Sequence, residues 1–213
     1  MKSTIKKIAP LNTDKEETIK SLRIDRQMIE IHLKRLTELF KTDTPEQIGQ
    51  KLQGIILRDN LFNAIMEEVV RSFEVTFDDE EIQDIAKHLV NQFPDKKAEV
   101  INEIAKKVII KKMVFEELAK EWNITVSDQD VNDSLEQYYK FSNQSIRQYK
   151  EDKNKFEGIR SVILEDKIAN ELIRRFYKIK VDHEAIKKQF EAAARRQQEA
   201  ELNKNKTESS QSS

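Results

Sequence analysis

The chain has 213 residues, of which 36 % are charged and 38 % hydrophobic, and its formal net charge is −1. Three Gly and three Pro are too few for the many tight turns of an all-β fold or for glycine-rich phosphate loops. The balanced charge provides no overall field to attract nucleic acid, so we expect an all-α protein that does not bind RNA or DNA.

The first predicted elements are a loose leader at residues 1–13 and a long amphipathic helix over 14–40. The apolar seam of this helix repeats at three- and four-residue steps, interrupted only by Arg26. Its members are Ile19, Leu22, Ile29, Leu33, Leu36 and Phe40, and a free ridge carries Ile24, Met28, Ile31 and Leu39. Such a helix must pack either on the rest of the chain or on a second copy, and the second alternative predicts a homodimer through the N-terminal helix. We assign residues 1–45 to an N-terminal extension.

The rest of the chain predicts a series of helices with short connections. Thr44 can cap the first of them, and Pro45 suits its first turn. The expected helices cover about 45–72, 79–92, 96–121, 128–140, 145–151 and 154–177. We place one domain over 46–185, followed by a charged helix and a disordered tail over 186–213.

A short phrase occurs three times between these helices, as "FEVTFDDEEI" (73–82), "WNITVSDQDV" (122–131) and "YKIKVDHEAI" (177–186). Each copy starts with an aromatic residue and continues with β-branched residues, which disfavour helix. Each then offers Asp78, Ser127 or Asp182 as an N-cap for the following helix. We therefore expect three corners, at each of which one helix ends and the next turns back.

Three segments resemble, in the same order, the C-terminal domain of bacterial trigger factor. They are "LFNAIMEEVVRSFEVTFDDEEI" (61–82), "KKMVFEELAKEWNITVSDQDVNDSLEQ" (111–137) and "KFEGIRSVILEDKIANELIRRFYKIKV" (155–181). In that family the domain is an all-helical body with arms that form a cradle for unfolded polypeptide, and the chaperone core of the periplasmic SurA family has a similar architecture. The resemblance implies an all-α helical body with projecting helical-hairpin arms.

The resemblance also implies a function. The ribosome-docking loop of the family, Gly-Phe-Arg-x-Gly-x-x-Pro, is absent from this sequence, and the chain has no room for the glycine-rich prolyl-isomerase domain. We therefore expect an ATP-independent chaperone that binds unfolded or nascent polypeptides, without isomerase activity and without a cofactor. The competing hypothesis is a helical scaffold that binds one specific protein partner through the N-terminal heptad helix.

A holding chaperone needs exposed apolar surface that is divided by charged residues. Two stripes off the main apolar faces have this pattern, one on helix 45–72 and one among the lysines of helix 96–121, where Val108 and Phe115 belong to the expected core face. A cluster near the break "FSNQS" is expected at an arm tip. The candidate polypeptide-binding residues are Leu57, Leu61, Ile65, Ile109, Ile110, Met113, Tyr138, Tyr139 and Phe141. The alternative for each side chain is ordinary packing against an arm, the N-terminal helix or the core.

Other functions have less support in the sequence. His32, His88 and His183 stand in no metal-binding spacing, so no metal site is expected. Acidic pairs such as Asp78 and Asp79 belong to solvated helix faces, and no serine has a recognisable base, so we expect no enzyme. The chain has no cysteine, no secretory signal and no long apolar run, which predicts a cytoplasmic protein without a membrane span.

Overall fold

The computed structural model of the protein describes residues 2–142 and 145–192, apart from the side chain of Phe141. The fold is mostly helical, which confirms the predicted class. In chain order the elements are β1 (Thr4–Lys7), β2 (Glu17–Ile19), α1 (Arg26–Leu39), α2 (Pro45–Val70), β3 (Phe73–Thr76), α3 (Asp79–Gln92), α4 (Ala98–Glu121), α5 (Asp128–Ser142), α6 (Arg147–Glu151), α7 (Lys153–Arg175) and β4 (Ile179–Val181). Residues 183–192 form a further helical segment.

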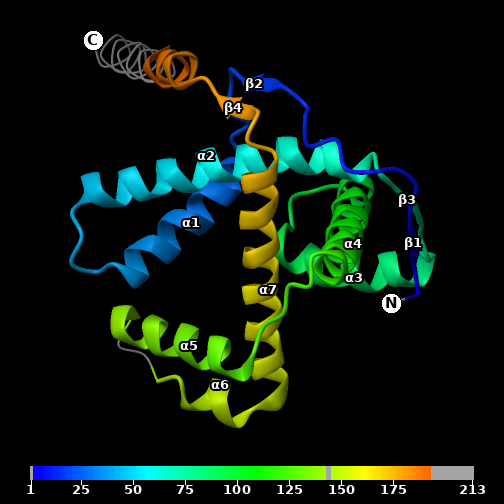
Figure 1. Ribbon diagram of the computed structural model, residues 1–213. Helices are drawn as coiled ribbons and strands as arrows, with labels where there is room; N and C mark the ends of the chain where they lie inside the picture. The colour runs from blue at the N-terminus through cyan, green and yellow to red at the C-terminus, as the bar shows by residue number, and fades with distance from the viewer. Residues whose placement is uncertain (1, 143–144, 193–213) are drawn as a thin grey trace, which may run out of the picture.

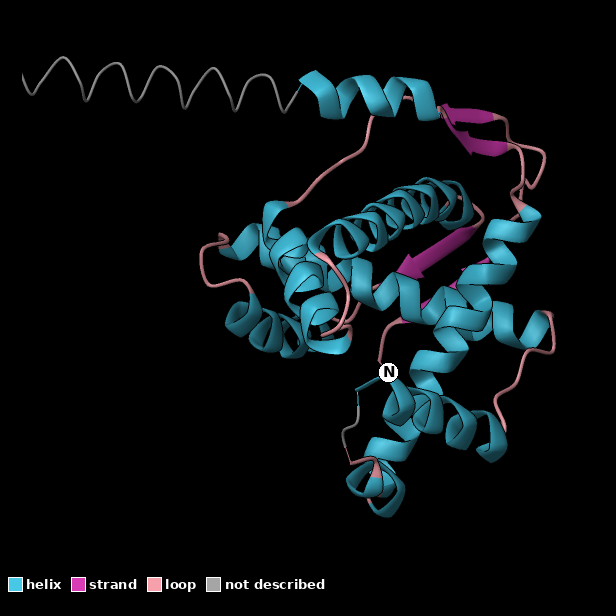
Figure 2. Cartoon of the chain, turned by 90° about the vertical axis from the view of Figure 1, so that its left-hand side faces the viewer, coloured by secondary structure: helices cyan, strands magenta, loops and turns pink. Residues whose placement is uncertain are grey.

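Helices α2 and α7 cross near the centre of the molecule, and three hairpins extend from this crossing (Figure 1). Helix α1 folds back along α2, α3 packs on α4, and α5 with α6 packs on the lower part of α7. The view turned by 90° shows that helix 183–192 projects from the top of the body (Figure 2). The arrangement is a helical body with projecting hairpin arms.

The main core lies where α2, α4 and α7 meet. Its buried residues come from one face of each helix and from the two corners that end α2 and α7. They are Ile65, Val69, Phe73, Val114, Phe115, Leu118, Ile168, Leu172, Phe176 and Ile179. Removing such side chains from water is the largest favourable contribution to folding.

Helix α4 buries a second face against α3, and this corrects the expected orientation of the helix. Ile109 and Met113, which were expected to project from the core, pack with Ile82 and Ala86 of α3. Val108, which was expected on the core face, is exposed. The cause is a partner on each side of α4, because α3 covers the face that the sequence pattern assigned to solvent.

Two of the three corners become strands that pair with the N-terminal segment. Strand β3 pairs antiparallel with β1, and β4 pairs parallel with β2. The leader is therefore not loose, and residues 14–25 are not helical, so the helix predicted to begin at Asp14 begins only at Arg26. Backbone pairing of this segment with the distant corners overrides its helical spacing.

All three predicted N-caps form. Asp78 accepts a hydrogen bond from the backbone of Glu81 at 2.9 Å, and Asp182 accepts one from Ala185 at 2.9 Å. At the second corner, Ser127 and Asp130 accept each other's backbone N–H groups, at 3.1 and 2.7 Å, which is the reciprocal pattern of a capping box. The caps explain why these helices begin where the sequence predicts.

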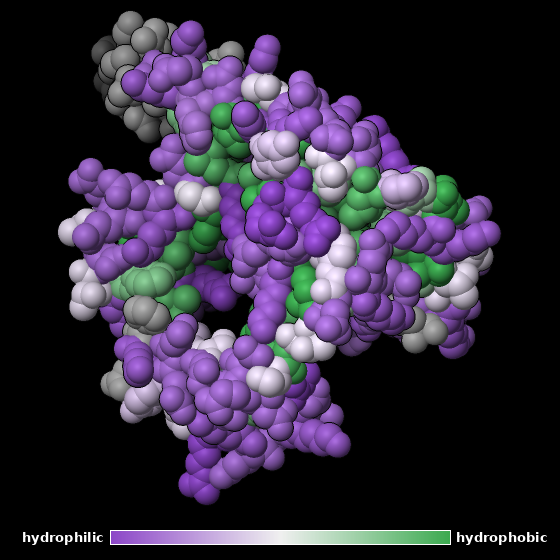
Figure 3. Space-filling model, viewed as in Figure 1, coloured by the Kyte–Doolittle hydropathy of each residue, from purple (hydrophilic) through white to green (hydrophobic). Residues whose placement is uncertain are grey.

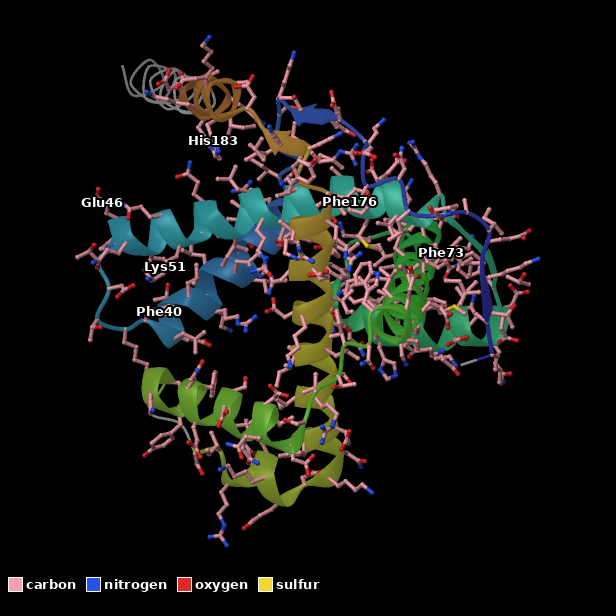
Figure 4. All side chains as sticks on the ribbon, viewed as in Figure 1. Phe40, Glu46, Lys51, Phe73, Phe176 and His183 are labelled. Carbon is pink, nitrogen blue, oxygen red and sulfur yellow. The ribbon has the colours of Figure 1, made fainter. Side chains whose placement is uncertain are left out.

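The aromatic anchor of the third corner differs from the one predicted. Phe176 is fully buried in the main core, whereas the neighbouring Tyr177 is exposed. Figure 4 shows Phe176 at the crossing of α2 and α7, with Phe73 on the other side of the core near α4. The comparison of the three phrases in the sequence predicted Tyr177, the first residue of the third phrase, as the anchor. The buried aromatic residue is instead its neighbour Phe176.

Candidate functional site

A hollow lies between α1, α5 and α7, and we call it the inter-arm hollow (Figure 3). The far end of α1 approaches α5, and the two helices are in contact. The arm made of α1 and α2 and the arm made of α5 and α6 therefore border the hollow from two sides, with α7 as its back. Figure 3 shows apolar surface along α1 beside this space.

Helix α1 exposes several large apolar side chains. Its inner face is formed by Ile29, His32 and Leu36, and Leu36 is buried. Outside that face, Met28, Ile31 and Leu33 are 38 %, 49 % and 43 % exposed. Exposed charged side chains of Glu30, Lys34 and Arg35 stand between them on the helix surface. The result is apolar surface interrupted by charge.

The tip of this arm is fastened by a contact between its two helices. Lys51 Nζ of α2 lies 4.6 Å from the centre of the Phe40 ring, which follows the end of α1. Figure 4 shows both residues near the turn that joins the two helices. Cation–π contacts of this kind contribute about 0.5–1 kcal/mol at exposed sites, so the tip is held without a large core.

A second apolar concavity, the α2–α7 groove, lies where α2, α7, β4 and helix 183–192 come together. Its volume is about 660 Å³, and its exposed surface is mainly apolar. The lining residues are Leu57, Arg58, Leu61, Asn170, Ile173, Lys180, Val181 and His183. Figure 4 shows His183 at the start of helix 183–192, between this helix and α2.

The structure divides the nine predicted binding residues into several groups. Leu57 and Leu61 line the α2–α7 groove, and Tyr138 and Tyr139 are exposed on α5. Ile110 is half-buried against the main core. Three of the residues are buried and cannot contact a client in this structure, namely Ile65, Ile109 and Met113. The side chain of Phe141 lies outside the described part of the structure.

The structure brings only some of the predicted residues together. Leu57 and Leu61 share one groove, whereas Tyr139 lines a separate pocket of about 600 Å³ with Ile146 and other residues at α6. The sequence had indicated Met28 and Ile31 as a free ridge, but it gave no reason to prefer this ridge as a binding surface. The sequence therefore contained the apolar ridge of α1, but it did not show that α5 lies opposite α1.

One acidic group stands out by its surroundings. Asp59 of α2 faces His32 of α1, with 3.5 Å between Asp59 Oδ2 and His32 Nε2. Burial raises the pKa of Asp59 above its usual range, although the charges of His32, Arg58 and Lys111 oppose this effect. This pair lies in a pocket between α1 and α2 of about 290 Å³. The pair thus forms a contact between α1 and α2.

Two further features concern other site types. Within residues 2–142 and 145–192, no group of three potential metal-ligating side chains is present. Across the same ranges, no helix combines the length and the apolar character needed to cross a membrane.

Two mycoplasma proteins are similar to this chain over most of their length. The uncharacterized protein MG377 of Mycoplasma genitalium is 36 % identical over 177 residues, which are 83 % of this chain and 92 % of that protein. Its homolog in Mycoplasma pneumoniae is 33 % identical over 177 residues, with the same coverage. The chain belongs to the MG377 family. No protein-family model matches the sequence.

The fold of the MG377 family is also represented among solved structures. The crystal structure of a hypothetical Mycoplasma protein, MPN555, superposes with a TM-score of 0.76 at 32 % sequence identity. The match covers 86 % of this chain and 93 % of that chain. Body and arms are thus features that this chain shares with a solved relative.

Proposed function

We propose that this member of the MG377 family is an ATP-independent chaperone that holds unfolded or nascent polypeptide at the inter-arm hollow. The observation that carries the proposal is the exposure of Met28, Ile31 and Leu33 on α1, the helix that borders the hollow on one side. Large apolar side chains that stay exposed and are separated by charges suit the binding of extended chains. Met adds adaptability to partners of varied shape.

The resemblance of residues 46–185 to the C-terminal domain of trigger factor supports the same function, because that domain also holds unfolded polypeptide between arms. Apolar burial is worth about 25 cal/mol per Å² before the cost of ordering the client is subtracted. A few exposed side chains therefore give weak, reversible binding. Release then needs no nucleotide, because the client leaves when it buries its own apolar residues.

The proposal is tested by suppression of aggregation of a chemically denatured enzyme. The wild-type protein should suppress aggregation at near-stoichiometric ratio, and a variant with Met28, Ile31 and Leu33 all replaced by Gln should lose most of this effect. A matched control replaces Val90, Val100 and Val108 by Gln, because these residues of α3 and α4 are 50 %, 45 % and 42 % exposed on a different arm. The control should retain the wild-type effect.

Three outcomes would contradict the proposal. If the wild-type protein neither suppresses aggregation nor binds an unfolded polypeptide, the chaperone function is wrong. If both triple variants lose activity equally, the inter-arm hollow is not the binding surface. Recovery of a single stoichiometric partner in a pull-down, instead of many unrelated clients, would support a scaffold protein.

A further inference from the structure

The α2–α7 groove has an aliphatic floor with hydrogen-bond donors at its edge. Leu57 and Leu61 of α2, Ile173 of α7 and Val181 of β4 supply the apolar part. Leu57 is not a member of either core cluster, whereas Leu61 and Ile173 pack against the main core from outside. The floor is therefore a surface extension of the core that the described part of the chain leaves open.

The edge of the groove has more hydrogen-bond donors than acceptors bound to them. Arg58 uses Nη2 for hydrogen bonds to Asp166 Oδ1, at 2.5 Å, and to Asn170 Oδ1, at 3.0 Å. Its other guanidinium nitrogens make no such bond within the described residues. Lys180 Nζ has no carboxylate within 4 Å in the same part of the chain, and the lining contains no Asp or Glu.

The carboxylate that contacts Arg58 at this edge is already engaged. Asp166 accepts from Arg58 through Oδ1 and from Asn170 Nδ2, at 3.0 Å, through Oδ2. The Asn170 side chain is thereby oriented and held against α7. Asp166 thus fixes the guanidinium of Arg58 in place, which leaves that group and Lys180 as the cationic part of the groove.

A ligand that covers the aliphatic floor must also cover part of this donor-rich edge. Donors that lose water without gaining an acceptor weaken binding, because their desolvation is not compensated. A purely apolar ligand would incur that cost, and a cationic ligand would add repulsion from Arg58 and Lys180. A ligand that carries a carboxylate beside aliphatic or aromatic groups would satisfy both parts, through charge-assisted hydrogen bonds.

We propose that the α2–α7 groove binds a short apolar peptide segment that carries an acidic side chain or a free C-terminal carboxylate. This inference rests on the proposed function, since it names the kind of client segment that the protein prefers. The volume of about 660 Å³ lies in the range of pockets that hold a drug-sized ligand, so it suits a few residues and not a folded surface.

The test uses short fluorescent peptides that share one alternating Leu and Ser sequence and differ in a central pair of Glu, Gln or Lys. The wild-type protein should bind the Glu peptide about tenfold more tightly than the Gln peptide, as expected for one or two charge-assisted hydrogen bonds. It should bind the Lys peptide least. A Glu peptide and a Gln peptide with amidated C-termini separate the side-chain carboxylate from the terminal one.

Two substitutions locate the effect in the groove. Lys180→Glu should reverse the preference, so that the Lys peptide binds more tightly than the Glu peptide. Lys97→Glu makes the same change in net charge at an exposed position in the loop before α4, and it should leave the preference unchanged. Leu57→Gln should weaken all three peptides while their order is kept, because it alters the floor and not the edge.

The possible results separate the groove from the wider function. Equal binding of the three peptides combined with no loss of affinity on amidation of the C-terminus, or an equal effect of Lys97→Glu and Lys180→Glu, would overturn the inference about the groove. If aggregation is suppressed and no peptide shows a charge preference, the chaperone function stands and the groove inference fails. If the Glu peptide binds selectively and aggregation is not suppressed, the groove inference stands and the chaperone function fails.

Discussion

Lys167 Nζ of α7 lies 3.2 Å from Asp130 Oδ1 in the first turn of α5. Lys167 also donates to the backbone carbonyl of Thr125, at 3.1 Å, and Arg160 pairs with Asp128 and donates to the carbonyl of Val126. Among the described residues, no strand pairs with the second corner. Lys167 and Arg160 of α7 hold this corner against the body instead. They set the position at which the α5 arm leaves the body.

The ionised form of Asp130 is stabilised in the folded protein. The pKa of Asp130 is lowered to about 2, first by the backbone N–H of Ser127, then by its hydroxyl and by Lys167. An acid with a lowered folded pKa adds stability that is complete above its unfolded pKa of about 4 and is lost as the pH falls toward 2. In Asp130→Asn, the free energy of unfolding should fall less steeply between about pH 4 and pH 2. Urea unfolding across this pH range measures the pH dependence of the free energy of unfolding. The same pH dependence in the variant and the wild type would show that the cap does not persist in solution.

The adjacent aromatics at the third corner should differ strongly in their effect on stability. Phe176 is fully buried, whereas Tyr177 is 64 % exposed. Phe176→Ala should lower the free energy of unfolding by about 3–5 kcal/mol, because it leaves a cavity in the main core. Tyr177→Ala should change it by no more than about 0.5 kcal/mol. Chemical denaturation of the two variants compares them directly. Similar decreases in the free energy of unfolding would show that Phe176 is not the buried aromatic residue of this corner.

Asp59 should destabilise the folded protein when it is ionised. Because burial raises its pKa, the protonated form is favoured on folding, and stability declines as the pH rises through the folded pKa. Asp59→Asn should therefore raise the free energy of unfolding at pH 7, by less than about 1 kcal/mol since the group is partly solvated.

The gain from Asp59→Asn should disappear at about pH 3, below the ordinary pKa of an Asp side chain, because the wild-type group is then protonated in both the folded and the unfolded state. Thermal unfolding at the two pH values measures this difference. Asp84→Asn is the control, because Lys87 lowers the pKa of Asp84 and its replacement should not stabilise the protein at pH 7. A stabilising effect of both substitutions would point to net charge instead of burial.

The two faces of α4 can be separated by neighbouring substitutions. Ile109→Ala should cost about 2–5 kcal/mol, because its side chain is buried against α3. Val108→Ala, at an exposed position, should stay within about 0.5 kcal/mol. A larger cost of Val108→Ala than of Ile109→Ala, measured by equilibrium unfolding, would favour the orientation that was predicted from the sequence.

The start of α2 and the starts of the helices that follow the corners could be predicted well because their signals are local. Thr44 and Pro45 define the start of α2, and Asp78, Ser127 and Asp182 cap the helices that follow the corners. A cap needs only the residues within one turn, so one sequence contains all the information. The spacing of apolar residues supplied the lengths of the helices between these caps.

The orientation of helices and the fate of the N-terminal segment required information from distant residues. Ile19 and Leu22 fit a helical seam, but residues 17–19 pair with β4 instead. Ile109 was placed outward because the position of α3 relative to α4 is not encoded in local spacing. For the candidate site, the apolar ridge of α1 was visible in the sequence, whereas the hollow beside it depends on where α5 lies.

The pairing of β2 with β4 has a consequence for the order of folding. Ile19 aligns with Val181, its carbonyl accepts a hydrogen bond from Asp182 at 2.9 Å, and Leu22 exchanges hydrogen bonds with Gln189. Contacts between such distant parts of a chain form late, since the whole intervening loop must be closed first. During synthesis, β2 leaves the ribosome long before β4 exists. The N-terminal segment therefore waits without its partner until residues 179–181 have been synthesised, and we expect β2 to dock only after the helices between the two strands have been made.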